Sequence, residues 1–218
     1  MPVIFDEVFT GLYRLGQATP SSLLQTNADI SVHAKLLTGG LLPLATTEAS
    51  ESIFRAFLST EKSDALLHGH SYTAHAVGCQ IANESLRTMT TMDKQGAWDV
   101  YKSDWQSGAV SVKSPRVPAT WSMWSKDFVT NLSFRRDVES VLALGSVLAI
   151  SMRDPAGAGY TSTAAIGLRD KLLEGSPNAA QVVHSRVLGN ILYLMASITS
   201  TKETLVQVES MVEKALSR

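Results

Sequence analysis

Asp6 and Lys35 carry opposite charges, and each stands just past a short apolar stretch of the sequence. The first stretch is residues 3–5, and the second is "DISVH", residues 29–33. We expect both to be strands, and in α/β sheets ligands bind at the carboxyl ends of strands. A carboxylate and an amine placed there could contact the same ligand, or they could form a structural ion pair at the sheet edge. The two residues alone leave both interpretations open.

The composition narrows the class of protein. The 218 residues contain 19 basic and 20 acidic side chains, a balance that gives no electrostatic reason to expect nucleic acid or an anionic membrane as a partner. Cys79 is the one cysteine, so an internal disulfide is impossible. No apolar run approaches the roughly 20 residues of a membrane span. The first residues do not resemble a targeting peptide, so from the sequence alone we expect a cytoplasmic location.

The hydrophobic pattern predicts strands alternating with helices, which indicates an α/β protein. We expect helices at residues 48–57, 75–92 and 162–173, and a last helix with a capping box of Ser200 and Glu203. Residues 140–152 are expected to form one apolar strand or a pair of strands interrupted by Gly145, and short strands are expected at 182–186 and 191–195. All four tryptophans lie within residues 95–131, where we predict helix, loop and helix with the tryptophans in packing.

The beginning of the sequence is unusual. "IFDEVFTGLYRLG" starts at Ile4, so the first apolar strand is reached after three residues. A buried strand normally follows other structure. We therefore expect either an abrupt domain or part of a larger one.

Two segments resemble a known family. "DEVFTGLYRLG" resembles the signature of the class III pyridoxal-phosphate (PLP) aminotransferases, and "AKLLTGGLLPLA" resembles their lysine segment. The resemblance implies that the cofactor is pyridoxal 5'-phosphate and that Lys35 is the catalytic lysine, which holds the cofactor aldehyde covalently. It implies that Asp6 keeps the pyridine nitrogen protonated. Val8 would pack on the ring face.

Further segments extend the resemblance. "LLHGHSYTAHAVGCQIANESL" resembles the region that contacts the cofactor phosphate from the second subunit, which implies phosphate contacts from Ser71 and His70 and a close backbone approach to substrate at Gly69. "RVLGNILYLM" resembles one subgroup, the adenosylmethionine-8-amino-7-oxononanoate aminotransferases of biotin biosynthesis. There Arg186 would bind the carboxylate of the keto substrate, and Tyr193 would line the same pocket.

The subgroup implies an activity: transamination of 8-amino-7-oxononanoate to 7,8-diaminononanoate, with S-adenosylmethionine as the amino donor. It also implies a homodimer and, from the fused eukaryotic members that carry dethiobiotin synthetase, a mitochondrial location. The implied fold is the PLP-dependent transferase fold of type I. Residues 1–95 would be the remainder of the large PLP-binding domain, and residues 96–218 a small C-terminal α+β domain.

In that family the aspartate motif lies well inside the large domain. The resemblance therefore implies that this chain is a fragment, about the C-terminal half of the aminotransferase. It would lack the glycine/serine phosphate cup, the aromatic residue that stacks on the ring, and part of the substrate pocket. The missing strands would leave a sheet edge bare.

Three alternatives remain. One is another class III aminotransferase that acts on an ω-amino acid, and another is a folded but non-catalytic remnant. The third is a zinc site, because His68, His70 and His75 lie close in sequence, with Cys79 as the nearest further ligand. A metal site needs a full ligand shell. We therefore predict no metal, and we expect Cys79 to be a small buried residue.

Overall fold

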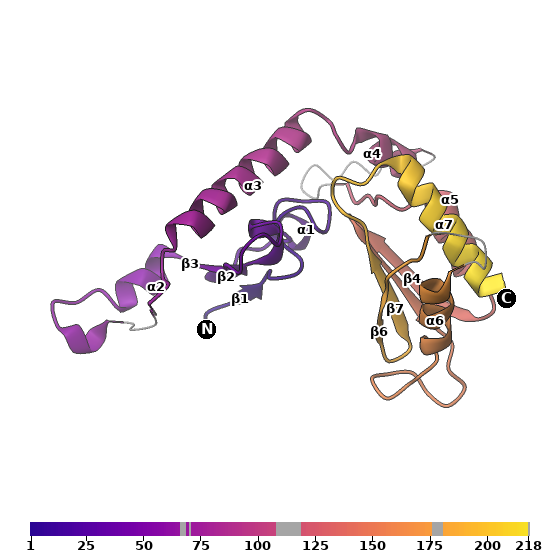
Figure 1. Ribbon diagram of the computed structural model, residues 1–218. Helices are drawn as coiled ribbons and strands as arrows, with labels where there is room; N and C mark the ends of the chain where they lie inside the picture. The colour runs from indigo at the N-terminus through magenta and orange to yellow at the C-terminus, as the bar shows by residue number, and fades with distance from the viewer. Residues whose placement is uncertain (66–68, 70, 108–118, 176–180, 218) are drawn as a thin grey trace. The chain divides into compact units, whose positions relative to one another are not determined.

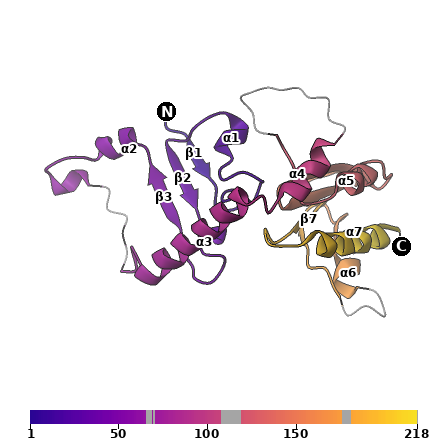
Figure 2. The same ribbon diagram turned by 90° about the horizontal axis from the view of Figure 1, so that it is seen from above.

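The computed structural model describes residues 1–65, 69, 71–107, 119–175 and 181–217, and it divides into two compact units (Figure 1). The N-terminal unit is Met1–Ala97, and the C-terminal unit begins at Trp98. Each unit contains its own sheet (Figure 2). The two units are therefore described separately.

The N-terminal unit is built on a three-stranded sheet of order β1-β2-β3. The strands are β1 (Ile4–Asp6), β2 (Ile30–His33) and β3 (Thr46–Ala49). β1 and β2 are parallel, with Asp6 opposite Val32, while β3 runs antiparallel to β2. The carboxyl ends of β1 and β2 consequently lie at the same edge of the sheet.

Helical segments complete the N-terminal unit: α1 (Ser21–Leu24), the 3₁₀ turns η1 (Lys35–Leu37) and η2 (Lys62–Asp64), α2 (Glu51–Ala56) and the long α3 (Ala76–Lys94). α3 begins where the Nδ1 atom of His75 accepts a hydrogen bond from the Gly78 amide at 3.0 Å. Its buried residues are Gly78, Ala82 and Met89.

Two predictions for the N-terminal unit are wrong. The helix predicted at 48–57 begins only at Glu51, because Thr46–Ala49 pairs with β2 as a strand. Cys79 is exposed rather than buried. Successive residues of an α-helix are rotated by about 100° around its axis. The Cys79 side chain therefore points away from the buried stripe of α3, to which Gly78 belongs.

The C-terminal unit is built on a four-stranded antiparallel sheet of order β4-β5-β7-β6. Its strands are β4 (Val138–Leu144), β5 (Val147–Met152), β6 (Arg186–Leu188) and β7 (Ile191–Met195). Of the two arrangements expected for residues 140–152, the structure has the pair of strands, because β4 and β5 form a hairpin. Gly145 in its turn has a φ of 55°, where glycine is favoured. In β7, Leu192 and Leu194 are buried while Tyr193 between them is half-buried, so one face of the sheet covers the core.

The helices of this unit are α4 (Asp99–Gln106), α5 (Lys126–Ser133), α6 (Ile166–Glu174) and α7 (Lys202–Ser217). Trp98, Trp121 and Trp124 are buried, as predicted for packing residues. Two of these buried rings also donate hydrogen bonds. Trp124 Nε1 donates to the Ser146 carbonyl at 3.1 Å, and Trp98 Nε1 donates to the Ile198 carbonyl at 2.9 Å.

Three element boundaries in the C-terminal unit differ from the prediction. α6 starts four residues late, because the Ser162 hydroxyl donates to Asp154 and accepts from the Ala164 amide, which holds a turn. The strand predicted at 182–186 instead begins at Arg186, where pairing with β7 starts. The first turn of α7 is capped by Thr201, whose Oγ1 accepts from the Thr204 amide, and not by Ser200.

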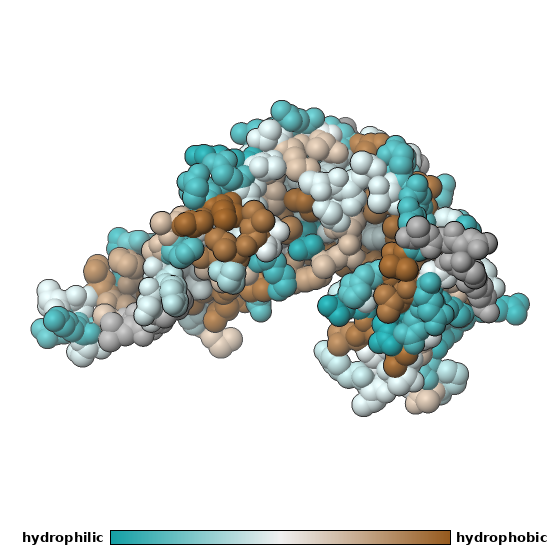
Figure 3. Space-filling view, in the orientation of Figure 1, coloured by the Kyte–Doolittle hydropathy of each residue, from teal (hydrophilic) through white to brown (hydrophobic). Residues whose placement is uncertain are grey.

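Both units expose apolar side chains (Figure 3). Examples are Ile4 and Phe54 in the N-terminal unit and Leu142 and Leu188 in the C-terminal unit. Within the described residues, no helix is long and apolar enough to span a membrane.

Candidate active site

Asp6 is the last residue of β1, and its carboxylate is fixed by the turn that follows. The Val8 amide donates to Asp6 Oδ1 at 3.1 Å, which is the hydrogen bond of an Asx turn. The Asp6 side chain remains exposed, and Val8 is half-buried beside it. The turn therefore holds a charged oxygen at the carboxyl edge of the parallel pair of strands.

Lys35 lies at the same edge, two residues after β2 ends. It is exposed and has a φ of 51°, a conformation that non-glycine residues rarely adopt. Such strain persists only where the surrounding structure imposes it, and it is concentrated at functional sites. The sequence alone gave no indication of this backbone conformation.

The turn after Lys35 is anchored from two sides. Leu37 and Thr38 are buried, and the Thr38 hydroxyl donates to the Leu42 carbonyl at 2.6 Å. The Ser85 hydroxyl on α3 donates to the Leu36 carbonyl at 2.7 Å. These contacts hold the backbone of Lys35 in place and leave its amine at the surface.

The residues expected to contact the cofactor phosphate come from a separate segment of the N-terminal unit. Ser71 is exposed in the turn before α3, while His70 lies outside the described residues. A hollow of about 680 Å³ beside this turn is lined by Leu42, Pro43, Leu44, Ala45, Thr47, Tyr72, Thr73, Ala74 and His75. The hollow joins the segment after Lys35 to the segment after Ser71.

Gly69 is exposed, and a side chain added there would make only ordinary contact with the Thr73 hydroxyl at 3.6 Å. The fold of this chain therefore does not itself demand glycine at position 69. His75, one of the possible zinc ligands, caps α3 with its Nδ1 atom. No cluster of metal-binding side chains exists among the residues that the structure describes.

Arg186 and Tyr193 lie on neighbouring strands of the C-terminal unit. They are direct partners in the antiparallel pair of β6 and β7, so their side chains leave the same face of the sheet. That face is opposite to the one from which Leu192 and Leu194 enter the core. Arg186 is exposed, and its guanidinium is accessible to a carboxylate.

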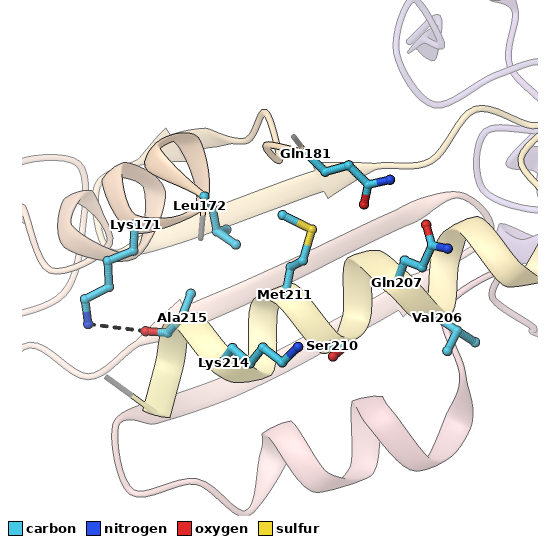
Figure 4. Close-up of a pocket in the computed structure, with 10 residues that line it drawn as sticks. Lys171, Leu172, Gln181, Val206, Gln207, Ser210, Met211, Lys214 and Ala215 are labelled. Atoms are coloured by element: carbon cyan, nitrogen blue, oxygen red, sulfur yellow. Dashed lines mark hydrogen bonds between the residues drawn. The ribbon is translucent and has the colours of Figure 1, made fainter. Parts of the chain in front are cut away.

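A second pocket, between α6 and α7, has a volume of about 350 Å³ (Figure 4). Leu172 and Met211 point into it, while the Lys171 ammonium donates to the Ala215 carbonyl at 3.2 Å. None of the candidate residues lines this pocket.

Sequence reasoning missed two buried charged residues in the segment after Asp6. Glu7 and Arg14 are both buried, and burial lowers the pKa of the Arg14 guanidinium, which lies 5.4 Å from the centre of the Phe9 ring. The one indication in the sequence is the position of Glu7 directly after Asp6. Successive side chains of a strand point to opposite faces of the sheet, so only one of these two acids can face the ligand.

Comparisons with known proteins show which proteins the chain resembles. Residues 1–102 match the model of the class-III aminotransferase family, so the chain contains a domain of this family. The bifunctional dethiobiotin synthetase/adenosylmethionine-8-amino-7-oxononanoate aminotransferase of Emericella nidulans is 58% identical over 219 residues, which cover 99% of this chain. The mitochondrial bifunctional dethiobiotin synthetase/7,8-diamino-pelargonic acid aminotransferase of Oryza sativa is 37% identical over the whole chain.

The chain spans 27% and 24% of the lengths of these two relatives. Among solved structures, the adenosylmethionine-8-amino-7-oxononanoate aminotransferase of Methanocaldococcus jannaschii superposes with a TM-score of 0.74 at 23% identity. The match covers 98% of this chain and 45% of that one. A PLP-bound amine transaminase from an uncultivated Pseudomonas species gives a TM-score of 0.72 at 22% identity. These structures confirm the predicted α/β transferase fold.

Proposed function

We propose that this chain is part of a PLP-dependent aminotransferase that converts 8-amino-7-oxononanoate to 7,8-diaminononanoate with S-adenosylmethionine as donor. The observation that carries the proposal is the placement of Asp6 and Lys35 at one edge of a parallel strand pair. The names of the relatives supply the substrates, and the name of the plant relative supports a mitochondrial location.

The residues present fit the cofactor. An exposed carboxylate held by the Val8 amide suits a protonated pyridine nitrogen, and an exposed amine on an anchored turn suits the aldehyde. Val8, half-buried beside Asp6, suits the face of the ring. When bound, PLP supplies an electron sink for the carbanion that forms at the substrate α-carbon.

Each residue then has one task. Asp6 keeps a proton on the pyridine nitrogen, and Lys35 holds the aldehyde carbon before substrate arrives. When it is not bound to the aldehyde, the Lys35 amine would be the base that moves a proton at the substrate α-carbon. Ser71 donates a hydrogen bond to the cofactor phosphate bound by the second subunit of the proposed homodimer. We assign a further contact with this phosphate to His70, and contact with the substrate to Gly69.

Arg186 and Tyr193 select the keto substrate. The guanidinium binds a carboxylate with two parallel hydrogen bonds, a geometry that an ammonium does not reproduce. Because the carboxylate of 8-amino-7-oxononanoate lies at the far end of an apolar chain, this contact sets the position of the substrate and does no chemistry.

The test compares Arg186→Ala with wild type in the complete enzyme that carries this chain, and follows the two half-reactions separately by single-turnover absorbance. Losing one charged hydrogen-bonding partner costs about 1.5–3 kcal/mol, or about 10- to 150-fold. We expect that loss in the half-reaction with the keto acid, and a much smaller loss with S-adenosylmethionine. Arg153→Ala, an exposed arginine at the end of β5, is the matched control.

Equal losses in both half-reactions would contradict the role of Arg186. Efficient use of an ordinary ω-amino acid by the wild type, with none of S-adenosylmethionine, would instead support the other class III activity. A complete enzyme with no transamination at all would support the non-catalytic alternative.

A further inference from the structure

Glu7 is a buried carboxylate directly behind the proposed cofactor site. Its side chain is 2% exposed, and one oxygen, Oε1, accepts a hydrogen bond from the Thr19 hydroxyl at 2.7 Å. The other oxygen, Oε2, lies 3.6 Å from Nδ1 of His33, whose side chain is 12% exposed. Within the described residues, neither Oε2 nor Nδ1 has a hydrogen-bond partner. Buried polar atoms in folded proteins normally have one, so the pair requires an explanation.

The backbone also joins the two strands at this point. The Glu7 amide donates to the carbonyl of Val32 at 3.0 Å, which continues the parallel pairing beyond β1. Glu7 follows Asp6, and His33 ends β2 two residues before Lys35. The pair of Glu7 and His33 therefore links the two strand ends that carry the proposed cofactor residues.

The loop after β1 is shaped around the Glu7 side chain. A Cβ atom added at Gly11 would lie 3.0 Å from each of three Glu7 atoms, Cβ, the carbonyl oxygen and Oε2. Glu7 thus packs directly on Gly11, whose amide donates to the Glu7 carbonyl at 3.0 Å. The loop then returns to Thr19, which holds Oε1. This enclosure fixes Oε2 in the direction of His33.

We propose that Glu7 and His33 are a positioning pair. The Nδ1–H group of His33 donates a hydrogen bond to Glu7 Oε2, and this bond holds the strand ends that carry Asp6 and Lys35 in place for one ligand. The separation of 3.6 Å exceeds a normal N–H···O bond by less than 1 Å, which a small rotation of either side chain removes. A carboxylate that accepts from a histidine also fixes which ring nitrogen carries the proton. This inference rests on the proposed function, since it assigns the pair to the site of Lys35.

The first test detects the hydrogen bond between Glu7 and His33 in the absence of cofactor. In the chain of residues 1–218 with ¹⁵N-labelled histidine, NMR shows which nitrogen of His33 carries the proton. We expect Nδ1 in the wild type and in Glu7→Gln, which keeps an acceptor oxygen, and Nε2 in Glu7→Leu. The exposed His184 serves as the control, and its signal stays the same in all three chains. A proton on Nε2 of His33 in the wild type would overturn the proposal.

The second test asks whether the pair positions the site. In the complete enzyme loaded with PLP, His33→Leu is expected to lower kcat about tenfold with little change in KM. It is also expected to shift the pH midpoint of the absorbance change of the cofactor bound to Lys35. His33→Asn, whose amide NH₂ can donate from near the position of Nδ1, should restore most of both values. The positioning role would be wrong if His33→Leu and His33→Asn had the same kcat and the same pH midpoint. It would also be wrong if the pH midpoint of His33→Leu equalled that of the wild type.

The two tests separate this proposal from the proposed function. If Lys35 is not the cofactor lysine, the loaded wild-type enzyme shows no absorbance that depends on Lys35. That result contradicts the proposed function and removes the positioning role. The NMR result still shows whether Glu7 and His33 are paired.

Discussion

The N-terminal unit and the C-terminal unit bury different kinds of side chain. Among the described residues, the buried apolar side chains of the N-terminal unit are Leu37, Ala82 and Met89, and they are accompanied by the charged residues Glu7 and Arg14. The C-terminal unit packs most of the buried apolar side chains around its sheet, with Leu148, Ile150 and Leu192 fully enclosed. Burial of apolar surface is the main source of stability. We therefore expect the C-terminal unit to be more stable than the N-terminal unit.

The left-handed backbone positions of non-glycine residues follow the same division. Those that the structure describes, Lys35 among them, all lie in the N-terminal unit, which has the smaller apolar core. Buried carboxylates do not follow it, since Glu7 lies in the N-terminal unit and Glu209 in the C-terminal unit. Exposed apolar residues do not separate the units, because Ile4 and Phe54 are exposed in one and Leu142 and Leu188 in the other. The residues proposed to hold the cofactor, Asp6 and Lys35, both lie in the N-terminal unit.

The largest expected effect concerns cofactor affinity. The chain spans 45% of the Methanocaldococcus jannaschii structure, and the segments that form the family's phosphate cup are expected outside it. Loss of two charge-assisted hydrogen bonds, each about 1.5–3 kcal/mol, weakens binding by about two to four orders of magnitude. We therefore expect residues 1–218 alone to bind PLP that much more weakly than the complete enzyme, with little or no turnover. Absorbance titration measures the two dissociation constants, and equal values would contradict the prediction.

A core substitution tests the stability difference between the units. Leu192→Ala removes a fully buried side chain from β7 and should lower the free energy of unfolding of the C-terminal unit by about 2–5 kcal/mol. All four tryptophans belong to this unit, so their fluorescence during urea unfolding reports on it alone. Far-UV circular dichroism of the same chain should show an earlier transition, from the N-terminal unit.

The control for this substitution is Leu142→Ala on β4, because Leu142 is 57% exposed and its loss should cost about 0.5 kcal/mol or less. A fluorescence transition that coincides with the circular dichroism transition in the wild type would remove the distinction between the units.

The smallest expected effect is a pH dependence within the C-terminal unit. Glu209 on α7 is buried and accepts hydrogen bonds from the Ser125 amide at 2.7 Å and the Ser125 hydroxyl at 2.8 Å. Burial raises the pKa of Glu209, and the nearby carboxylates of Glu213 and Asp104 act in the same direction, while the bonds from Ser125 oppose the shift.

A raised pKa means that the folded state binds the proton more tightly than the unfolded state. This contribution to stability is complete below the unfolded pKa of 4.5 and is lost as the pH rises through the folded pKa. We expect Glu209→Gln to remove this part of the pH dependence, measured by tryptophan fluorescence in urea at several pH values. Glu174→Gln, an exposed acid on α6, is the control. An unchanged pH dependence in Glu209→Gln would contradict the assignment.

The comparison of the units also shows what the sequence could predict. The apolar patterns of β2 and β7 are strong, so these strands were predicted closely, and the bounds of α3 agree with the expected helix within two residues. Gly145 marked the interruption between β4 and β5. β3 was missed because "TTEA" is polar, and only its pairing with β2 makes it a strand.

The candidate site shows the same limit. The strand pattern placed Asp6 and Lys35 at one edge, because parallel strands end on the same side. The pair of Glu7 and His33 depends on the register of Asp6 opposite Val32 and on a loop that folds back over Gly11. Neither follows from the local sequence. The strained φ of Lys35 likewise comes from the anchoring of its turn by Thr38 and Ser85.

The central claim is that Lys35 is the residue that holds the cofactor. The most direct test treats the PLP-loaded complete enzyme with borohydride, which fixes the cofactor to its lysine, and then identifies the modified peptide by mass spectrometry. Lys94→Ala, an exposed lysine at the end of α3, serves as the matched control for Lys35→Ala. We predict that the label is on Lys35, persists in Lys94→Ala and is absent from Lys35→Ala. Label on another lysine of the wild type, or retention of a specific label in Lys35→Ala, would contradict the account.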